Sequence, residues 1–340
     1  MKRNFSLMLL LPVLALLVSA GTLLHAAEAV PPQAFTWRAA TLDEVLKEAK
    51  EANKPVMLCV YATWCPYCKR QEAEIWNAPE AATTFKNLIP IRVDFDKPEG
   101  QAVKKQFNIL SLPSILFLKS TGEEVDRIAG YDDKQKFLKE AALLMKGVDP
   151  LPGMQKKLAA SPKDTPLLLQ VGTRLLHRGN LAEAKTLFEK IQQVDPKNTK
   201  GQTAETYFIL GRYYSRVVDD AASALPYWKQ LVEKFPQSDN ALGGFSWALN
   251  AFNKLNQFDE GFTWGSQIVN AQQGKTSGNF AYILASQCAK KDVHLEESLT
   301  LLEKAKTSDI GADEVTALET TLKDLIQKKT NVTENKGNKG

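Results

Sequence analysis

The residues best suited to chemistry in this 340-residue chain are its four cysteines, Cys59, Cys65, Cys68 and Cys288. A disulfide between Cys65 and Cys68 closes a loop too small to stabilise a fold appreciably. The value of this pair is therefore chemical. The spacing predicts a dithiol that is reversibly oxidised to a disulfide by thiol–disulfide exchange.

The position of the pair along the chain supports this chemistry. An apolar, strand-like segment ends shortly before Cys65, and a helix is expected from Cys65 to about Ile75. Unpaired N–H groups and the dipole at a helix N-terminus stabilise a thiolate, so we expect Cys65 to have a lowered pKa and to be the attacking nucleophile. Cys68, one turn later and expected to be more buried, would resolve the mixed disulfide. Pro66 suits the first helical turn, where a missing N–H costs nothing.

The elements that must position this pair alternate between strand and helix over residues 34–147. Strands are expected at 35–37, 55–61, 88–95, 114–118 and 124–129, and helices at 41–49, 65–75, 101–107 and 134–145. Thr41 and Glu44 have the spacing of a capping box, and Thr121-Gly122 predicts a hairpin turn. We predict an α/β domain over residues 30–148, with the cysteine pair at the start of the helix that follows a buried central strand.

The second half of the chain is predicted to be helical and repetitive. A Pro-rich segment over 149–165 predicts a linker that contains one short helix, and a polar composition over 329–340 predicts a disordered tail. Between them, over 166–328, residues of similar size recur about every 40 positions. The recurring sets are Gly172, Ala184, Phe188 and Pro196; Gly211, Ala224, Trp228 and Pro236; and the weaker sets Ala248, Gly261 and Ile268, and Ala285, Ser298, Leu302 and Ala305.

This spacing resembles that of tetratricopeptide (TPR) repeats. In such repeats small residues let paired helices approach closely, and the stacked pairs leave a concave surface for peptides or partner proteins. A plain helical bundle is the alternative interpretation.

A further motif, Ser111-Leu112-Pro113, precedes the apolar segment 114–118. With this motif and the cysteine pair, residues 34–147 resemble the thioredoxin superfamily, and most of all the C-terminal periplasmic domain of the electron-shuttling protein DsbD. The matching segments are Lys54-Pro55-Val56-Met57-Leu58, Tyr61-Ala62-Thr63-Trp64-Cys65, Leu112-Pro113-Ser114-Ile115-Leu116-Phe117 and Gly122-Glu123-Glu124. The resemblance covers about a third of the chain and excludes the repetitive half.

The resemblance implies exchange with protein thiols and disulfides, without a cofactor beyond the Cys65–Cys68 disulfide itself. It implies that Pro113 is cis and packs against this disulfide, and that the exposed backbone of Leu112 pairs with an extended substrate segment. Trp64, Pro66 and Tyr67 are expected to support the active site. The Pro-Tyr dipeptide is similar to that of glutaredoxins and leaves the direction of electron flow open. We favour reduction or isomerisation, with a DsbD-type membrane protein as electron donor.

Cys59 departs from the family pattern. Six residues before the attacking cysteine the family usually has a buried Asp, which helps to deprotonate the resolving thiol. A neutral thiol is a weaker base, so exchange is expected to be slower or to use another group, for which Glu72 and Glu74 are candidates. Cys59 itself is either a small buried hydrophobic residue or a third redox thiol that pairs with Cys68.

The first residues predict export. Lys2 and Arg3 precede an apolar run from Leu7 to Val18, and Ala27-Glu28-Ala29 offers a cleavage site for signal peptidase. Residues 1–29 are therefore expected to be a cleaved signal peptide that directs the chain to the periplasm, with an uncleaved anchor as the alternative. The net charge of +4 and the absence of a dense basic stripe argue against nucleic acid as a partner.

Zinc binding and a scaffold role are the two alternative interpretations. A structural zinc site needs four ligands, whereas Cys288, His177 and His294 lie far from the Cys65–Cys68 pair in the sequence and form no second close pair. A binding or scaffold protein is the alternative to an enzyme, with the repeats as its main working part and the cysteine pair as a redox sensor. The intact cysteine pair together with Leu112-Pro113 favours the enzyme.

Overall fold

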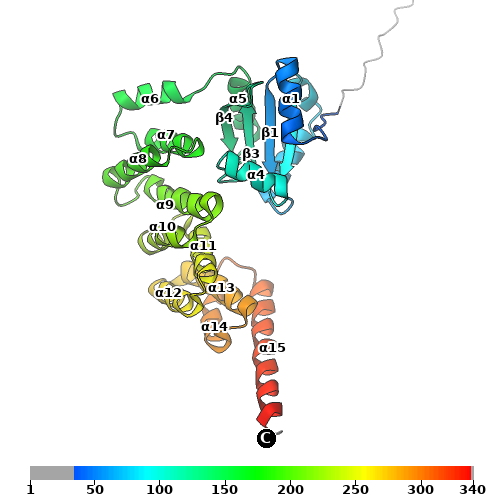
Figure 1. The fold of residues 1–340 in the computed structure, drawn as a ribbon. Helices are drawn as coiled ribbons and strands as arrows, with labels where there is room; N and C mark the ends of the chain where they lie inside the picture. Colours follow the sequence, from blue (N-terminus) through cyan, green and yellow to red (C-terminus); the bar gives the residue numbers. More distant parts are fainter. Residues whose placement is uncertain (1–33, 338–340) are drawn as a thin grey trace, which may run out of the picture.

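Residues 34–337 are described by a computed structural model, with side chains through residue 331. The predicted signal peptide lies outside the described residues. An α/β domain comes first, and a stack of helices follows it along the chain (Figure 1). No helix within residues 34–337 has both the length and the apolar character that crossing a bilayer requires.

The α/β domain is built on a four-stranded sheet in the order β2-β1-β3-β4. The strands are β1 (Val56–Tyr61), β2 (Ile89–Asp94), β3 (Ser114–Leu118) and β4 (Glu124–Ala129). β1 pairs in parallel with β2 and antiparallel with β3, and β3 and β4 form the predicted hairpin with the predicted bounds. The helices of this domain are α1 (Leu42–Ala52), α2 (Pro66–Gln71), the π-helix η1 (Glu72–Trp76), α3 (Ala81–Thr84), α4 (Pro98–Gln106) and α5 (Lys134–Leu144).

β1 is apolar throughout because its alternate side chains enter two separate cores. Val56, Leu58 and Val60 pack with residues of α1 and α4. Met57 and Cys59 pack with residues of η1 and α5. A strand buried on both faces holds the residue that follows it, Ala62, in a fixed place, and this matters for the cysteine pair three residues later.

The start of the domain agrees in part with the prediction from the sequence. Thr41 and Glu44 form both hydrogen bonds of the predicted capping box at the N-terminus of α1. The predicted strand over 35–37 is wrong, because this segment pairs with no described strand and only the next residue, Arg38, makes an isolated bridge, with Ile91. Its aromatic rings instead pack against Trp76, so their apolar character reflects burial rather than strand pairing.

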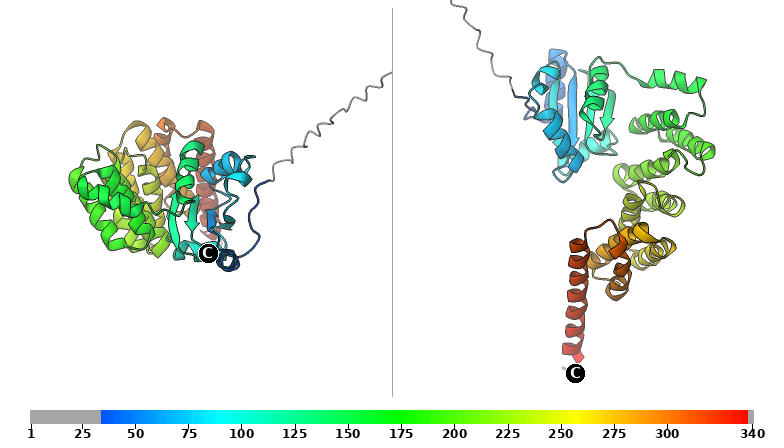
Figure 2. Two further views of the ribbon diagram at one scale, coloured as in Figure 1. Left: turned by 90° about the horizontal axis from the view of Figure 1, so that it is seen from above. Right: turned by 180° about the vertical axis from the view of Figure 1, so that it is seen from behind.

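The second part consists of paired helices that stack into an arc descending from the sheet (Figures 1 and 2). The helices are α6 (Leu151–Ala160), α7 (Thr165–His177), α8 (Leu181–Val194), α9 (Gln202–Arg212), the π-helix η2 (Tyr213–Val218), α10 (Ala221–Lys234), α11 (Ala241–Lys254), α12 (Phe258–Ala271), α13 (Gly274–Lys291), α14 (Leu295–Leu302), the 3-10 helix η3 (Glu303–Thr307) and α15 (Ala312–Gly337).

The recurring residues lie where paired helices touch. A Cβ placed on Gly172 would lie 2.6 Å from the ring of Phe188, and one on Gly211 would lie 2.6 Å from the ring of Trp228. Both rings are fully buried. The repeat of about 40 residues therefore has a physical cause, because a glycine on the first helix of a pair makes room for a large ring on the second.

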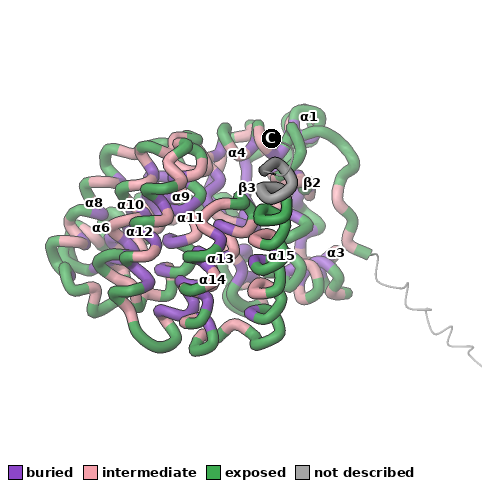
Figure 3. Tube along the Cα trace, turned by 90° about the horizontal axis from the view of Figure 1, so that it is seen from below, coloured by how far each residue is buried: buried purple, intermediate pink, exposed green. Residues whose placement is uncertain are grey.

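The two segments that flank the predicted repeats both contain helices. The predicted linker over 149–165 includes the expected short helix, α6, whose first turn accepts Pro152 because the missing N–H of a proline costs nothing there. The predicted disordered tail over 329–340 is helical as far as residue 337. α15 starts on buried residues such as Val315 and Leu322, and helix propagation then extends it although its outer surface is largely exposed (Figure 3).

The two parts meet where the C-terminal end of α7 contacts the start of β4, the edge strand of the sheet. The guanidinium of Arg174 pairs with the Asp126 carboxylate at 2.9 Å. Arg178 donates to both carboxylate oxygens of Asp149 at 2.8 Å and to the carbonyl of Val125 at 3.0 Å. These contacts, which we call the junction, join β4 and Asp149 to α7 through charged groups, of which Asp126 is the most deeply buried.

His177, the last residue of α7, is buried in the junction. Its Nδ1 atom has no hydrogen-bond partner among the described residues. Burial, and then the positive charges of Arg127, Arg174 and Arg178, lower the pKa of its imidazole well below the usual value. The native protein therefore holds this histidine neutral at a pH where the unfolded chain protonates it.

Stability should fall below about pH 6.5, where the unfolded chain binds a proton that native His177 does not. This group contributes a slope of up to about 1.4 kcal/mol per pH unit. The variant His177→Gln should show a flatter loss of unfolding free energy between pH 7.5 and 5, measured by urea denaturation. Parallel curves for the two proteins would contradict the assignment.

Gly211→Ala is expected to lower the free energy of unfolding by about 1–3 kcal/mol, because its new methyl group meets the buried ring of Trp228. Gly243→Ala is the matched control, since a Cβ there would lie 3.4 Å from the Phe208 ring, an ordinary contact. The control should be neutral or should gain up to about 1 kcal/mol from helix propensity. Equal effects of both changes in urea denaturation would refute the packing argument.

Candidate active site

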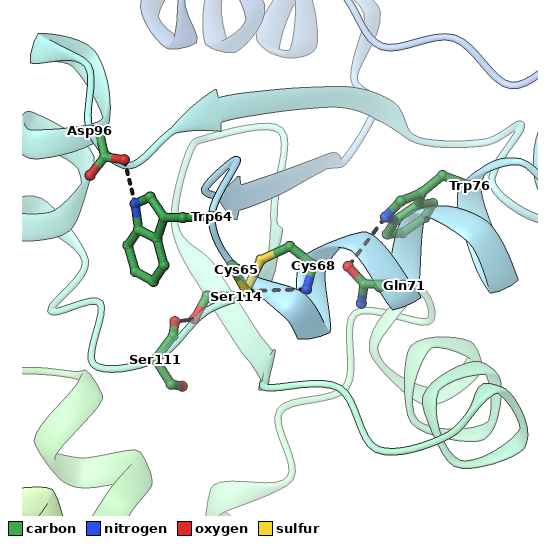
Figure 4. The surroundings of a disulfide bond; sticks show 8 residues. All are labelled: Trp64, Cys65, Cys68, Gln71, Trp76, Asp96, Ser111 and Ser114. Carbon is green, nitrogen blue, oxygen red and sulfur yellow. Dashed lines mark hydrogen bonds between the residues drawn. A yellow bond between two sulfur atoms is a disulfide. The ribbon is translucent and has the colours of Figure 1, made fainter. Parts of the chain in front are cut away.

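Cys65 and Cys68 form a disulfide at the N-terminus of α2, with 5.3 Å between their Cα atoms (Figure 4). Cys65 is the N-cap residue, and its Sγ accepts a hydrogen bond of 3.1 Å from the backbone N–H of Cys68. Pro66 occupies the first turn. The predicted location at a helix N-terminus is thus confirmed, and the observed N–H bond is the type that stabilises charge on Cys65.

The two cysteines are buried to a similar degree. Cys65 is 3% exposed and Cys68 is 7% exposed, so the expectation that Cys68 is the more buried of the two is wrong. The reason is that the side chain of an N-cap residue folds back over its own helix. The exposed part of the site is a rim formed by Trp64 and Tyr67, which are 54% and 56% exposed.

A residue that follows a second strand, β2, orients the side chain of Trp64. Its indole N–H donates a hydrogen bond of 2.6 Å to the carboxylate of Asp96, which follows the carboxyl end of β2 (Figure 4). β1 and β2 are parallel, so their carboxyl ends lie at the same edge of the sheet. Asp96 was not predicted as a site residue, although its position just after a predicted strand was the available signal.

The loop that precedes β3 also borders the site. The Leu112–Pro113 peptide bond is cis, as the resemblance implied. The Ser114 hydroxyl donates to the carbonyl of Ser111 at 2.8 Å, and the N–H of Gly130 donates to the carbonyl of Pro113 at 2.7 Å. The side chain of Leu112 is buried in the same core as the disulfide, while its backbone N–H and C=O have no partner within residues 34–337.

Comparison with known proteins agrees with this arrangement. Residues 42–143 match the model of a family described as a thioredoxin-like domain. Over 102 residues the chain is 36% identical to the thiol:disulfide interchange protein DsbD of Klebsiella pneumoniae, and over 147 residues it is 35% identical to DsbD of Vibrio cholerae. The alignments cover 29% and 39% of this chain but only 17% and 24% of those relatives, so the chain spans less than a quarter of their length.

Residues 42–143 form a thioredoxin-like thiol–disulfide oxidoreductase domain. This domain is related to a part of DsbD that makes up 17% of that protein, and an all-helical region follows it. Among solved structures, the oxidised C-terminal domain of Neisseria meningitidis DsbD is similar, with 28% identity, a TM-score of 0.26, and coverage of 30% of this chain and 87% of that chain.

Cys59 lies in the thioredoxin-like domain on β1, and it is a free thiol that is 3% exposed. It belongs to the core formed with η1 and α5, whereas Cys65 and Cys68 belong to the other core. Burial raises the pKa of Cys59 to about 12, with the Glu72 charge adding to the effect and Arg92 opposing it. At neutral pH this thiol is therefore protonated, which favours a packing role over that of a base or nucleophile.

The two candidate carboxylates have other partners. Glu72 pairs with Arg92 at 3.3 Å. Glu74 accepts a 2.5 Å hydrogen bond from the Tyr131 hydroxyl and a 2.9 Å bond from Arg70, and these two bonds lower the pKa of Glu74. Neither carboxylate forms a hydrogen bond with a cysteine in the described part of the chain.

Gln71 is a polar residue near the disulfide that the sequence did not indicate (Figure 4). It is 1% exposed, and its Oε1 accepts a 3.2 Å bond from the indole of Trp76, while its Nε2 has no partner among the described residues. No local pattern distinguishes a buried glutamine from an exposed one, because its burial depends on tertiary packing.

Cys59→Ala should leave the rate of disulfide exchange nearly unchanged and lower the free energy of unfolding by about 1 kcal/mol, because it removes a small buried group. Exchange with a peptide disulfide and urea denaturation measure the two effects. A large loss of exchange, or a Cys59–Cys68 disulfide found by mass spectrometry of the non-reduced protein, would support the third-thiol hypothesis instead.

Proposed function

We propose that this protein is a periplasmic thiol–disulfide oxidoreductase that reduces or isomerises disulfides of protein substrates. The observation that carries the proposal is the Cys65–Cys68 disulfide at the N-terminus of α2, next to the unpaired backbone of Leu112. The first residues support export through their resemblance to a signal peptide.

In the reductive direction, the thiolate of Cys65 attacks one sulfur of a substrate disulfide. A Cys65–substrate disulfide forms, and the other substrate sulfur leaves as a thiolate that takes up a proton. The Cys68 thiol then loses its proton and attacks the Sγ of Cys65, which releases the first substrate sulfur as a second thiolate. Two electrons have passed to the substrate, and the enzyme retains the Cys65–Cys68 disulfide.

Substrate binding uses the backbone of Leu112 and the aromatic rim. The N–H and C=O of Leu112 can pair with an extended segment of the substrate as in strand addition, which is independent of the substrate's sequence. Trp64 and Tyr67 offer apolar surface beside the pair. An unfolded or locally extended chain with a disulfide fits this site better than a small molecule does.

A membrane protein of the DsbD type is the proposed source of electrons, because the thioredoxin-like domain is related to a domain of DsbD. The helical region is proposed to be a TPR-like repeat domain that recruits a protein partner, supported by its helix pairs and by the recurrence of glycine against a large ring. These two assignments make recruitment and exchange the tasks of separate domains.

The first test is the reduction potential of the Cys65–Cys68 couple, measured by thiol trapping in glutathione or dithiothreitol buffers. A value near or below about −200 mV supports reduction or isomerisation, whereas about −120 mV indicates a strong oxidant and contradicts the proposed direction. Without a reversible two-electron transition, the enzyme proposal fails and the alternative of a binding protein takes its place.

Cys65→Ser should abolish exchange with a disulfide-bonded peptide, since the attacking thiolate is lost, and should leave the far-ultraviolet circular dichroism unchanged. Cys288→Ala is the matched control, because Cys288 is a buried free cysteine of α13. Residual exchange in Cys65→Ser, or equal loss in the control, would refute the assigned nucleophile.

A further inference from the structure

The loop that carries Leu112 and Pro113 is held by the helical region as well as by the sheet. Just before this loop, the side-chain amide of Asn108 donates a 2.9 Å hydrogen bond to the carbonyl of His177. The side chain of Leu110 is buried in the core of the first helix pairs, with residues such as Leu168 and Ile209. The guanidinium of Arg216, in η2, donates a 3.2 Å hydrogen bond to the carbonyl of Leu110.

Arg216 also contacts the segment that orients Trp64. Its guanidinium lies 5.8 Å from the ring centre of Phe95, the residue before Asp96, and 5.2 Å from the ring centre of Trp247 in α11. One side chain of the helical region thus contacts both segments that flank the disulfide, one leading to Leu112 and the other to Asp96.

The surroundings of Arg216 disfavour a charged side chain, so packing alone does not explain an arginine at this position. No carboxylate pairs with it in the described part of the chain, and burial and the neighbouring Arg212 lower its pKa to about 10. Desolvating a guanidinium without a counter-ion is costly, and an aliphatic side chain of similar length would fill the same space without that cost. The guanidinium therefore has a specific use, and its one hydrogen bond points to the carbonyl of Leu110.

We propose that Arg216 is a positioning residue of the redox site, through which the helical region sets the Leu112–Pro113 loop for binding of extended protein substrates. The proposal rests on the proposed function, because it assumes that substrates pair with the backbone of Leu112. Small thiols and disulfides do not use this backbone, so their exchange with Cys65 is independent of Arg216.

The test compares Arg216→Met, which keeps the length of the side chain and removes the guanidinium, with Arg216→Lys, which retains a charged donor. Arg212→Met is the matched control. Arg212 lies one turn earlier and stacks on Phe208 at 4.4 Å, and it makes no contact with the thioredoxin-like domain in the described structure. Circular dichroism and thermal unfolding of the full chain establish that each variant is folded.

In Arg216→Met, kcat/KM for a disulfide-bonded peptide should fall about tenfold through KM, while exchange with oxidised dithiothreitol should stay within about twofold of the unmodified protein. Arg216→Lys should recover part of the loss, and Arg212→Met should behave as the unmodified protein. Equal losses for peptide and dithiothreitol, or equal losses in Arg212→Met, would overturn the proposal.

Hydrogen exchange gives a second readout that needs no activity. Arg216→Met should accelerate amide exchange in a peptide covering residues 107–116, and Arg212→Met should not. Unchanged exchange in Arg216→Met would overturn the proposal even if activity fell. The two proposals can also fail separately. If the unmodified protein did not react with peptide disulfides, the proposed function and the role of Arg216 in substrate binding would both be overturned. Faster amide exchange in Arg216→Met would then show only that Arg216 holds the loop.

Discussion

The site depends on one constraint, the pairing of β1 with a parallel strand on one side and an antiparallel strand on the other. This pairing brings the carboxyl ends of β1 and β2 and the amino end of β3 to the same edge of the sheet. The segments that follow or precede those ends contain the disulfide, Asp96 and Pro113. Because β1 is packed on both faces, a one-residue slip in register would move each of its side chains from one core into the other and disrupt the packing of both, so this convergence is strongly fixed.

Much of this architecture was predictable from local sequence. The capping box of α1 and the β3–β4 hairpin are encoded in a few adjacent residues, and the structure has both where the sequence places them. The positions of the cysteine pair and of Pro113 followed from short motifs. Predictions failed where the apolar or polar character of a segment had more than one possible cause. The aromatic segment 35–37 is buried without being a strand, and the polar end of α15 is helical.

The contacts between the two parts of the chain could not be predicted. Arg216 and the carbonyl of Leu110 are 106 residues apart in sequence, and Arg174 and Asp126 are 48 apart. No periodicity links such residues, because their meeting depends on how an entire stack of helices is oriented against the sheet. The burial of Gln71 and the nearly equal burial of Cys65 and Cys68 were hidden for the same reason, since exposure is a property of the assembled structure.

The contact between the end of α7 and β4 has a consequence for association between molecules. The edge strand of an open sheet presents unpaired backbone groups that can recruit another chain, a common route to aggregation. Here Arg178 donates a hydrogen bond to the carbonyl of Val125, and the ion pair of Arg174 and Asp126 lies beside it. The C-terminal end of α7 thus covers the start of this edge strand and discourages uncontrolled strand addition there.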